Sequence, residues 1–374
     1  MGEELWSPYL PRYLDALGAS LFIIGLWSAG TNLLEGFLFW GGGSLSHRLG
    51  ERGTLALTGL MPVAGYVVFL LTDSVAAAIV GSFLVSSWEA FSVPATFAVV
   101  GRSLTRQHRT AAFAVQSIQK RLPRIFGPWI GGIVLAALGV ATGVRTLLVV
   151  ALGCAVLAIV VQWFFVRGGP PSAPLSISKR EVWHAASPAL KRLWWSDVLV
   201  RWGDWLARDF IVLYCLKTIG ISTALFGSFV ALQMTTALIT YFPIAAVVDR
   251  GHQRPFIGLT FLLVALTPAF FALAHGPVGL ALAFVVFGLR EIGEPARKSL
   301  ITNSFPEAYR ARGVGLYWGS RAFAIFPAPI AGSLLMQAFG PRALHRSAFA
   351  VGLAGAALFA LTLRGTPVDA PRAA

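Results

Sequence analysis

Ionisable side chains interrupt several long apolar segments of this sequence, and they are the residues from which chemistry could start. A charged group in such a segment is costly unless it is paired or hydrated, so each one is a candidate for binding or proton transfer. Acidic and basic residues occur here together, which also favours ion pairs that hold helices in register. The candidates for a substrate or proton pathway are Glu35, Glu89, Arg121, Asp204, Arg208, Arg290, Glu291, Glu294 and Arg321.

Four of the ionisable residues share one helical face. Asp197, Arg201, Asp204 and Arg208 follow one another at spacings of 4, 3 and 4 residues. This spacing places all four on one stripe of a helix, and we expect the stripe to face the protein interior.

Carboxylates within the apolar segments are candidates for carrying a proton. Burial and a nearby arginine change the proton affinity of a carboxylate in opposite directions, so a group between these influences can bind and release a proton. Asp204, Glu35 and Glu291 fit this description. No spacing of histidine, cysteine or acidic residues predicts a metal site, and no nucleophile–base pair or phosphate-binding loop occurs. We therefore expect neither an enzyme nor a cofactor.

The elements that carry these residues are predicted to be membrane-spanning helices. Of the 374 residues, 56% are hydrophobic and only 12% are charged. The apolar residues form blocks of about twenty, which is the length that crosses the hydrocarbon layer as a helix. The sequence thus predicts an all-α membrane protein. The spans are predicted at 2–17, 20–42, 54–72, 75–100, 112–138, 144–166, 191–216, 221–246, 256–275, 278–299, 313–337 and 344–363.

The net charge of +14 reflects orientation in the membrane rather than a nucleic-acid partner. Most lysines and arginines outside the apolar blocks fall on one side, which the positive-inside rule makes cytoplasmic. Arg297 is assigned to that side with the loop residues. The connector and the C-terminus are predicted to be cytoplasmic in a multi-pass protein of the cell (inner) membrane.

The sequence contains two related halves. Gly25 and Gly227 lie 202 residues apart, as do Arg48 and Arg250, and 200 residues separate Arg121 from Arg321. Each half contains an even number of spans, so we expect two parallel six-helix bundles. The repeat pairs Arg121 with Arg321, and two arginines facing each other would bind an anionic group. The predicted division is residues 1–166, a connector at 167–190, residues 191–366 and a tail at 367–374, with a first span about ten residues too short.

Two segments resemble motifs of the major facilitator superfamily. GSLSHRLGER after the second span and AAVVDRGHQR after the eighth are similar to its gate-loop signature, although His47 replaces an acid and Ala245 replaces a glycine. FGPWIGG in the fifth span is similar to a motif of its antiporter branches. The matching gate residues are Gly43, His47, Arg48, Arg52, Asp249, Arg250 and Arg254, and the matching helix-packing residues are Gly127, Pro128, Gly131 and Gly132.

The resemblance implies a secondary transporter that works by alternating access. Its partners would be the lipid bilayer, a small-molecule substrate and protons. The antiporter motif favours export, the carboxylates within the spans favour proton coupling, and we expect a monomer. Two other functions stay open. One is a symporter or facilitator for an anionic solute that uses Arg121 and Arg321, and the other is a receptor or scaffold that does not transport.

Overall fold

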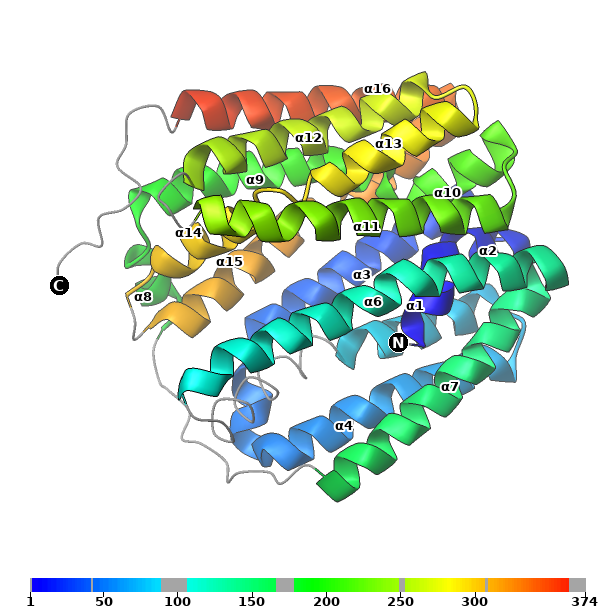
Figure 1. The fold of residues 1–374 in the computed structure, drawn as a ribbon, viewed down its shortest axis with the longest axis horizontal. Helices are drawn as coiled ribbons and strands as arrows, with labels where there is room; N and C mark the ends of the chain where they lie inside the picture. Colours follow the sequence, from blue (N-terminus) through cyan, green and yellow to red (C-terminus); the bar gives the residue numbers. More distant parts are fainter. Residues whose placement is uncertain are drawn as a thin grey trace. The chain divides into compact units, whose positions relative to one another are not determined.

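The computed structural model describes residues 2–41, 43–88, 106–165, 178–248, 253–306 and 309–362. Within these ranges every regular element is a helix, as the hydropathy pattern predicts (Figure 1). Five helical stretches are long and apolar enough to cross a membrane. They are Leu21–Phe39, Val140–Phe164, Thr223–Thr240, Arg254–Leu273 and Arg312–Thr362.

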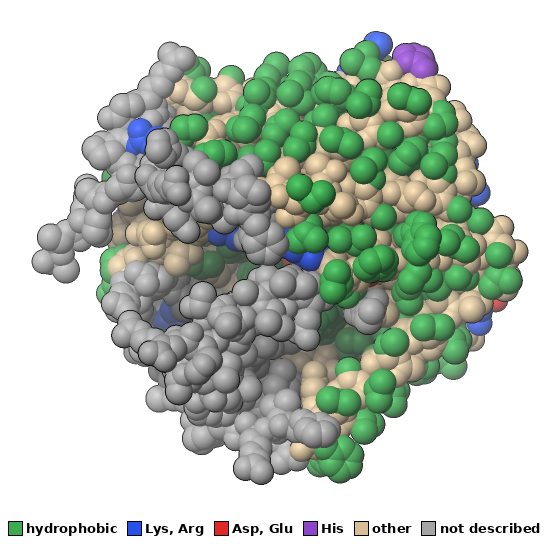
Figure 2. Space-filling view, viewed as in Figure 1, with side chains coloured by type: hydrophobic (Ala, Val, Ile, Leu, Met, Phe, Trp, Pro, Cys, Tyr) green, Lys and Arg blue, Asp and Glu red, His purple; other side chains and the backbone are tan. Residues whose placement is uncertain are grey.

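The described surface is rich in large apolar side chains (Figure 2). Phe164 and Val278 are each 77% exposed, and Leu71 and Phe339 are each 73% exposed. Water would solvate such side chains poorly, whereas lipid chains match them. The surface therefore suits a bilayer.

The first half of the sequence begins with a broken helix and continues with long helices. Gly18 and Gly139 occupy the left-handed backbone region, with φ of 90° and 78°, and each ends a helix. Residues 43–53, predicted as a loop, are helical instead. The elements are α1 (Glu3–Trp6), η1 (Ser7–Tyr9), α2 (Leu10–Ala16), α3 (Leu21–Gly41), α4 (Gly43–Leu71), a helix at Val75–Trp88, α6 (Arg106–Leu138) and α7 (Val140–Phe165).

The second half contains more breaks than its hydropathy predicts. The span predicted at 278–299 is two helices separated by a turn at 290–293, and Gly340, with φ of 81°, divides α16 into two parts. The elements are α8 (Lys179–His184), α9 (Pro188–Ala207), η2 (Arg208–Phe210), α10 (Ile211–Leu213), η3 (Tyr214–Ile219), α11 (Thr223–Val248), α12 (Gln253–Leu273), α13 (Pro277–Leu289), α14 (Glu294–Asn303), α15 (Arg310–Ile325) and α16 (Ala328–Thr362).

The chain forms two compact units, and each includes a short segment from the other half of the sequence. Unit 1 contains residues 1–20, 33–176 and 222–231, and unit 2 contains residues 21–32, 177–221 and 232–374. The division of the sequence at the connector 167–190 stays a prediction, since much of the connector lies outside the described residues.

Glycines in α6 allow close packing inside unit 1. A Cβ atom on Gly131 would overlap the carbonyl group of Leu5, and one on Gly132 would overlap that of Thr223. The buried Tyr9 hydroxyl donates a hydrogen bond of 2.6 Å to the carbonyl oxygen of Pro128. The segment that resembles an antiporter motif thus serves as a packing surface.

Unit 2 repeats this packing at the positions that the repeat predicts. A Cβ atom on Gly332 would overlap the carbonyl group of Leu206, and one on Gly25 would overlap Ser333 and the carbonyl oxygen of Pro329. Helices approach this closely only where a side chain is absent.

We expect Gly131→Ala to destabilise the protein by about 1–3 kcal/mol, because the added methyl group overpacks the contact with Leu5. Gly153→Ala on α7 is the matched control, because nothing lies within 4 Å of the position its Cβ would take. Thermal unfolding in detergent measures both. Equal melting temperatures for the two variants would contradict the packing role.

Candidate functional site

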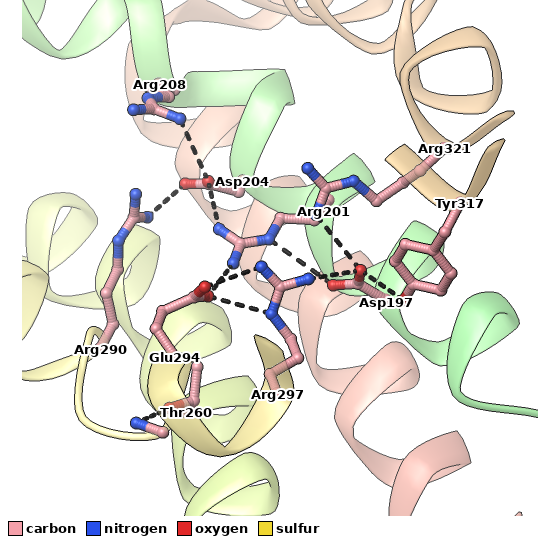
Figure 3. A network of polar contacts seen from close by, with 11 residues as sticks. Asp197, Arg201, Asp204, Arg208, Thr260, Arg290, Glu294, Arg297, Tyr317 and Arg321 are labelled. Carbon is pink, nitrogen blue, oxygen red and sulfur yellow. Dashed lines mark hydrogen bonds and ion pairs between the residues drawn. The ribbon is translucent and has the colours of Figure 1, made fainter. Parts of the chain in front are cut away.

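The acidic and basic stripe of α9 lies in the interior of unit 2, as its spacing predicts (Figure 3). Asp197 is 0% exposed, Asp204 is 5% exposed and Arg201 is 9% exposed. Arg208, at the end of the stripe, is exposed. Three charges of the stripe are therefore buried and must find partners on neighbouring helices.

The Asp197 carboxylate binds groups from three elements. Its Oδ2 accepts hydrogen bonds from Arg297 Nη1 at 2.8 Å, the Tyr317 hydroxyl at 2.8 Å and Arg321 Nη1 at 3.2 Å. Arg201 Nε lies 3.7 Å from Oδ1 on the same helix. The single negative charge of Asp197 is thus shared by three guanidinium groups, and none of them is neutralised by Asp197 alone.

Glu294 and Asp204 complete the network. Glu294 Oε1 lies 2.5 Å from Arg201 Nη2, and Glu294 Oε2 lies 2.7 Å from Arg297 Nη2. Asp204 Oδ1 lies 2.5 Å from Arg290 Nη1. Its other oxygen lies 3.7 Å from Arg201 and 4.0 Å from Arg208. These pairs link α9 to Arg290, at the start of the α13–α14 turn, and to Glu294, directly after it.

The turn between α13 and α14 positions Arg290 and Glu294. The Gly293 N–H donates a hydrogen bond of 2.6 Å to Thr260 Oγ1 of α12. A Cβ atom on Gly293 would overlap the carbonyl group of Phe256, so a glycine is needed at this contact. Pro295, in the first turn of α14, cannot continue the hydrogen bonding of the preceding helix. The break lets α13 and α14 present charges to different parts of α9.

Even without the exposed Arg208, the network carries more positive than negative charge. Among the residues with described side chains, it joins Arg201, Arg290, Arg297 and Arg321 to only three carboxylates. The Nε atoms of Arg201, Arg290 and Arg321 are buried without a hydrogen-bond partner. The Arg321 guanidinium lies 4.1 Å from the centre of the Trp318 ring. An uncompensated guanidinium in this setting attracts an anionic group.

The other predicted pathway residues lie outside this network. Glu291 is half-buried in the α13–α14 turn. Glu35 on α3 and Arg121 on α6 are half-buried and belong to unit 1. Glu89 lies outside the described residues. The expectation that Arg121 faces Arg321 stays a prediction.

The predicted gate residues are described only in part. The side chains of Gly43, His47, Arg48 and Arg52 are outside the described set, although their backbone is helical within α4. Asp249 and Arg250 lie outside the described residues, and Arg254 is half-buried on α12.

The prediction that Arg297 lies with the cytoplasmic loop residues is wrong, because Arg297 belongs to helix α14. It is 1% exposed and binds both Asp197 and Glu294. The turn at 290–293 starts a new helix, and the spacing of three residues from Glu294 puts Arg297 on the same face. That spacing was the available signal, whereas nothing in the sequence singled out Tyr317.

No group of three or more histidine, cysteine or acidic side chains among the described residues could hold a metal ion. Every described carboxylate of the network instead has an arginine partner. The arrangement is suited to binding through charge rather than through metal chemistry.

Comparison with known proteins identifies the chain. The model of the Major Facilitator Superfamily matches residues 1–216 and 198–374. The chain belongs to this superfamily. It is therefore a secondary transporter of small solutes and a multi-pass integral membrane protein, and it is not an enzyme. No curated protein matches the sequence.

Solved transporters share the fold at low sequence identity. A POT family transporter in complex with a thioalcohol-conjugated peptide is 15% identical with a TM-score of 0.73, over 97% of this chain and 92% of that chain. The human organic anion transporter MFSD10 is 15% identical with a TM-score of 0.64, over 96% and 95%. A bacterial homologue of the human lysosomal transporter Spinster is 13% identical with a TM-score of 0.68, over 96% and 95%.

We expect Arg297→Met to destabilise the protein by about 3–5 kcal/mol, because it leaves Asp197 and Glu294 buried with fewer cations. Combining it with Asp197→Asn should cost less than the sum of the two single changes, with a coupling of about 1–3 kcal/mol. Unfolding in mixed micelles by sodium dodecyl sulfate measures these free energies.

Arg145→Met is the control, because Arg145 pairs with Asp73 at a position where the two side chains are 32% and 68% exposed. Its cost should stay below about 1 kcal/mol. Strict additivity between Asp197 and Arg297 would show that their contact does not stabilise the fold.

Proposed function

We propose that the protein transports a small organic solute that carries an anionic group, and that Arg321 binds this group. The observation that supports the proposal is the sharing of Asp197 by Arg201, Arg297 and Arg321. Arg297 also has Glu294, and Arg201 also has Glu294 and Asp204. Asp197 is the single described ion-pair partner of Arg321, at 3.2 Å.

The surroundings of Arg321 favour a ligand with both a charge and an apolar part. One face of its guanidinium lies on Trp318, while Nε has no hydrogen-bond partner. A carboxylate, sulfonate or phosphate could accept from the unused N–H groups, and an aromatic or aliphatic part could pack beside the indole ring. Arg121, the equivalent residue of the first half, is our candidate for a second contact.

We expect Arg321→Gln to weaken binding of an organic anion by about 10- to 100-fold, the range lost with one charge-assisted hydrogen bond. The probes are benzoate and its neutral counterpart benzamide, and thermal stabilisation of the purified protein measures binding. Arg321→Lys keeps the charge and should lose less, because lysine cannot bind an anion through two parallel hydrogen bonds.

Arg145→Gln provides the comparison, since its pair with Asp73 is partly exposed and lies in unit 1. It should bind benzoate as the wild type does. If a wider panel of small carboxylates, sulfonates and phosphate esters binds equally well to wild type and Arg321→Gln, Arg321 is not the anion site.

A second proposal concerns energy coupling and direction. We propose that transport is coupled to protons and runs outward. The resemblance of the Gly127–Gly132 segment to an antiporter motif supports outward transport, and the half-buried carboxylates Glu35 and Glu291 support proton coupling. Asp204 is held by Arg290 at 2.5 Å, which favours its ionised form in this conformation. Glu35 and Glu291 are then the better candidates from the sequence for proton exchange.

Orientation and association complete the proposal. The excess of basic residues in the loops favours the cell membrane, with the connector 167–190 and the C-terminus in the cytoplasm. We propose a monomer, since each six-helix half already has a partner within the same chain.

We expect Glu35→Gln to abolish solute flux driven by a proton gradient in reconstituted vesicles, while exchange of labelled for unlabelled solute continues. The reason is that glutamine keeps the shape of glutamate but cannot carry a proton across the cycle. Asp73→Asn, at a 68% exposed side chain, should leave both fluxes unchanged. Insensitivity of wild-type flux to a protonophore would exclude proton coupling.

A further inference from the structure

Asp209 is half-buried and differs from the buried acids of unit 2. It lies in η2, between α9 and α10, and Ser28 Oγ of α3 donates a hydrogen bond to its Oδ2. Asp197, Asp204 and Glu294 each have an arginine within 3 Å, whereas no ion pair joins Asp209 to any residue in the described part of the chain. Its described partner is thus a neutral hydroxyl group.

This hydrogen bond lies where the start of α3 joins residues from the second half of the sequence, within unit 2. Gly25 and Ser28 are three residues apart on one face of α3. Gly25 packs against the carbonyl oxygen of Pro329, and Ser28 is 1% exposed. We call this pair of contacts the α3 joint. It consists of the close approach of Gly25 to the Pro329 carbonyl oxygen and the hydrogen bond from Ser28 to Asp209.

Unit 1 contains the equivalent joint without an acid. Gly227, the repeat partner of Gly25, packs against the carbonyl oxygen of Pro128. Thr223 Oγ1 donates a 3.0 Å hydrogen bond to the Gly132 carbonyl oxygen. The position 201 residues before Asp209 is Pro8. Only one of these two equivalent joints therefore has a carboxylate in the described structure.

The charged groups around Asp209 come from its own segment. Residues 21–32 of α3 and 328–339 of α16, the two elements that meet at this joint, contain no ionisable side chain. Within its own segment, the charged residues nearest to Asp209 in the sequence are Arg208 and Asp204. Arg208 Nη1 lies 4.0 Å from Asp204, and its guanidinium lies 4.9 Å from the centre of the Trp205 ring.

We propose that Asp209 is a proton-binding residue of the transport cycle, which holds a proton while the α3 joint is closed and releases it when the joint opens. A carboxylate that leaves water without a cation is costly, and a bound proton removes its charge. Opening the joint lets water hydrate the carboxylate, so the ionised form favours the open joint. Protonation of Asp209 therefore favours closure of the joint, and closure favours protonation by the same factor.

The inference deepens the proposed proton coupling, and its test needs no solute. Spin labels at Phe22→Cys on α3 and Phe339→Cys on α16 report the joint, because these side chains are 41% and 73% exposed and both lie in unit 2. Cys154→Ser and Cys215→Ala remove the free thiols. Pulsed electron paramagnetic resonance on the full chain in lipid nanodiscs then gives the ratio of closed to open joints between about pH 5 and pH 9, a range that covers perturbed carboxyl groups.

In the wild-type chain we expect the closed-to-open ratio to rise on acidification by up to about tenfold per pH unit, as for one linked proton. Asp209→Asn, which resembles the protonated acid, should stay closed at every pH. Ser28→Ala should lower the closed fraction at every pH but keep the pH dependence, because the acid is retained. Asp209→Glu should keep a pH dependence with a shifted midpoint.

A wild-type ratio that does not change with pH would overturn the inference, and so would Asp209→Asn with the pH dependence of the wild type. If Asp209→Asn does not fold, a pH-independent Asp209→Glu overturns it equally. Asp73→Asn is the control and should behave as the wild type. Failure of solute flux to respond to a protonophore, with the distance response intact, would reject proton-coupled transport while the linkage at Asp209 stands.

Discussion

A guanidinium group buried among helices needs an anion within reach, and the organisation of unit 2 follows from that need. Asp197, Asp204 and Glu294 bind three buried arginines and the half-buried Arg321, which come from α9, α14, α15 and the turn before α14. Removing Asp197 would leave Arg321 with no described ion-pair partner, and removing Asp204 would leave Arg290 with none, so the helices are fixed to one another through these pairs. Under the proposed function, the same shortage of negative charge would let Arg321 bind an anionic group of the solute.

Close helix packing is the second condition, and it is met by the absence of side chains. Gly132 and Gly332 sit at equivalent places in the two halves, and each faces a backbone carbonyl group on a neighbouring helix. Contacts of this kind depend on shape rather than on charge, and in lipid they replace the hydrophobic driving force that water would supply. The packing surfaces are alike in the two halves, whereas the described ion-pair network is confined to unit 2. The two halves therefore share their glycine packing contacts but differ in their described ion pairs.

The sequence was sufficient for the fold, because twenty-residue apolar blocks and a repeat of about 201 residues leave few arrangements in a membrane. It also predicted the buried stripe of α9, since that signal is periodic. It was wrong where a local interruption decided the outcome. Hydropathy did not reveal the turn at 290–293, which depends on Gly293 meeting Thr260 and Phe256, and Arg297 was misplaced as a result. Residues 43–53 looked like a loop from their charges, yet their backbone continues as helix α4.

Neither compact unit is encoded by one continuous stretch of sequence, and this affects how the chain can be made. Unit 1 includes residues 222–231, and unit 2 includes residues 21–32. During synthesis, the part of unit 1 within the first 176 residues is therefore incomplete until residues 222–231 have been inserted. Until then, the surface of α6 that contacts Thr223 stays uncovered. Residues 21–32 in turn leave the ribosome long before the segments that they pack against. Contacts between residues so far apart in sequence form late, so the order of insertion sets how long the glycine-lined faces of α3 and α6 stay open to lipid.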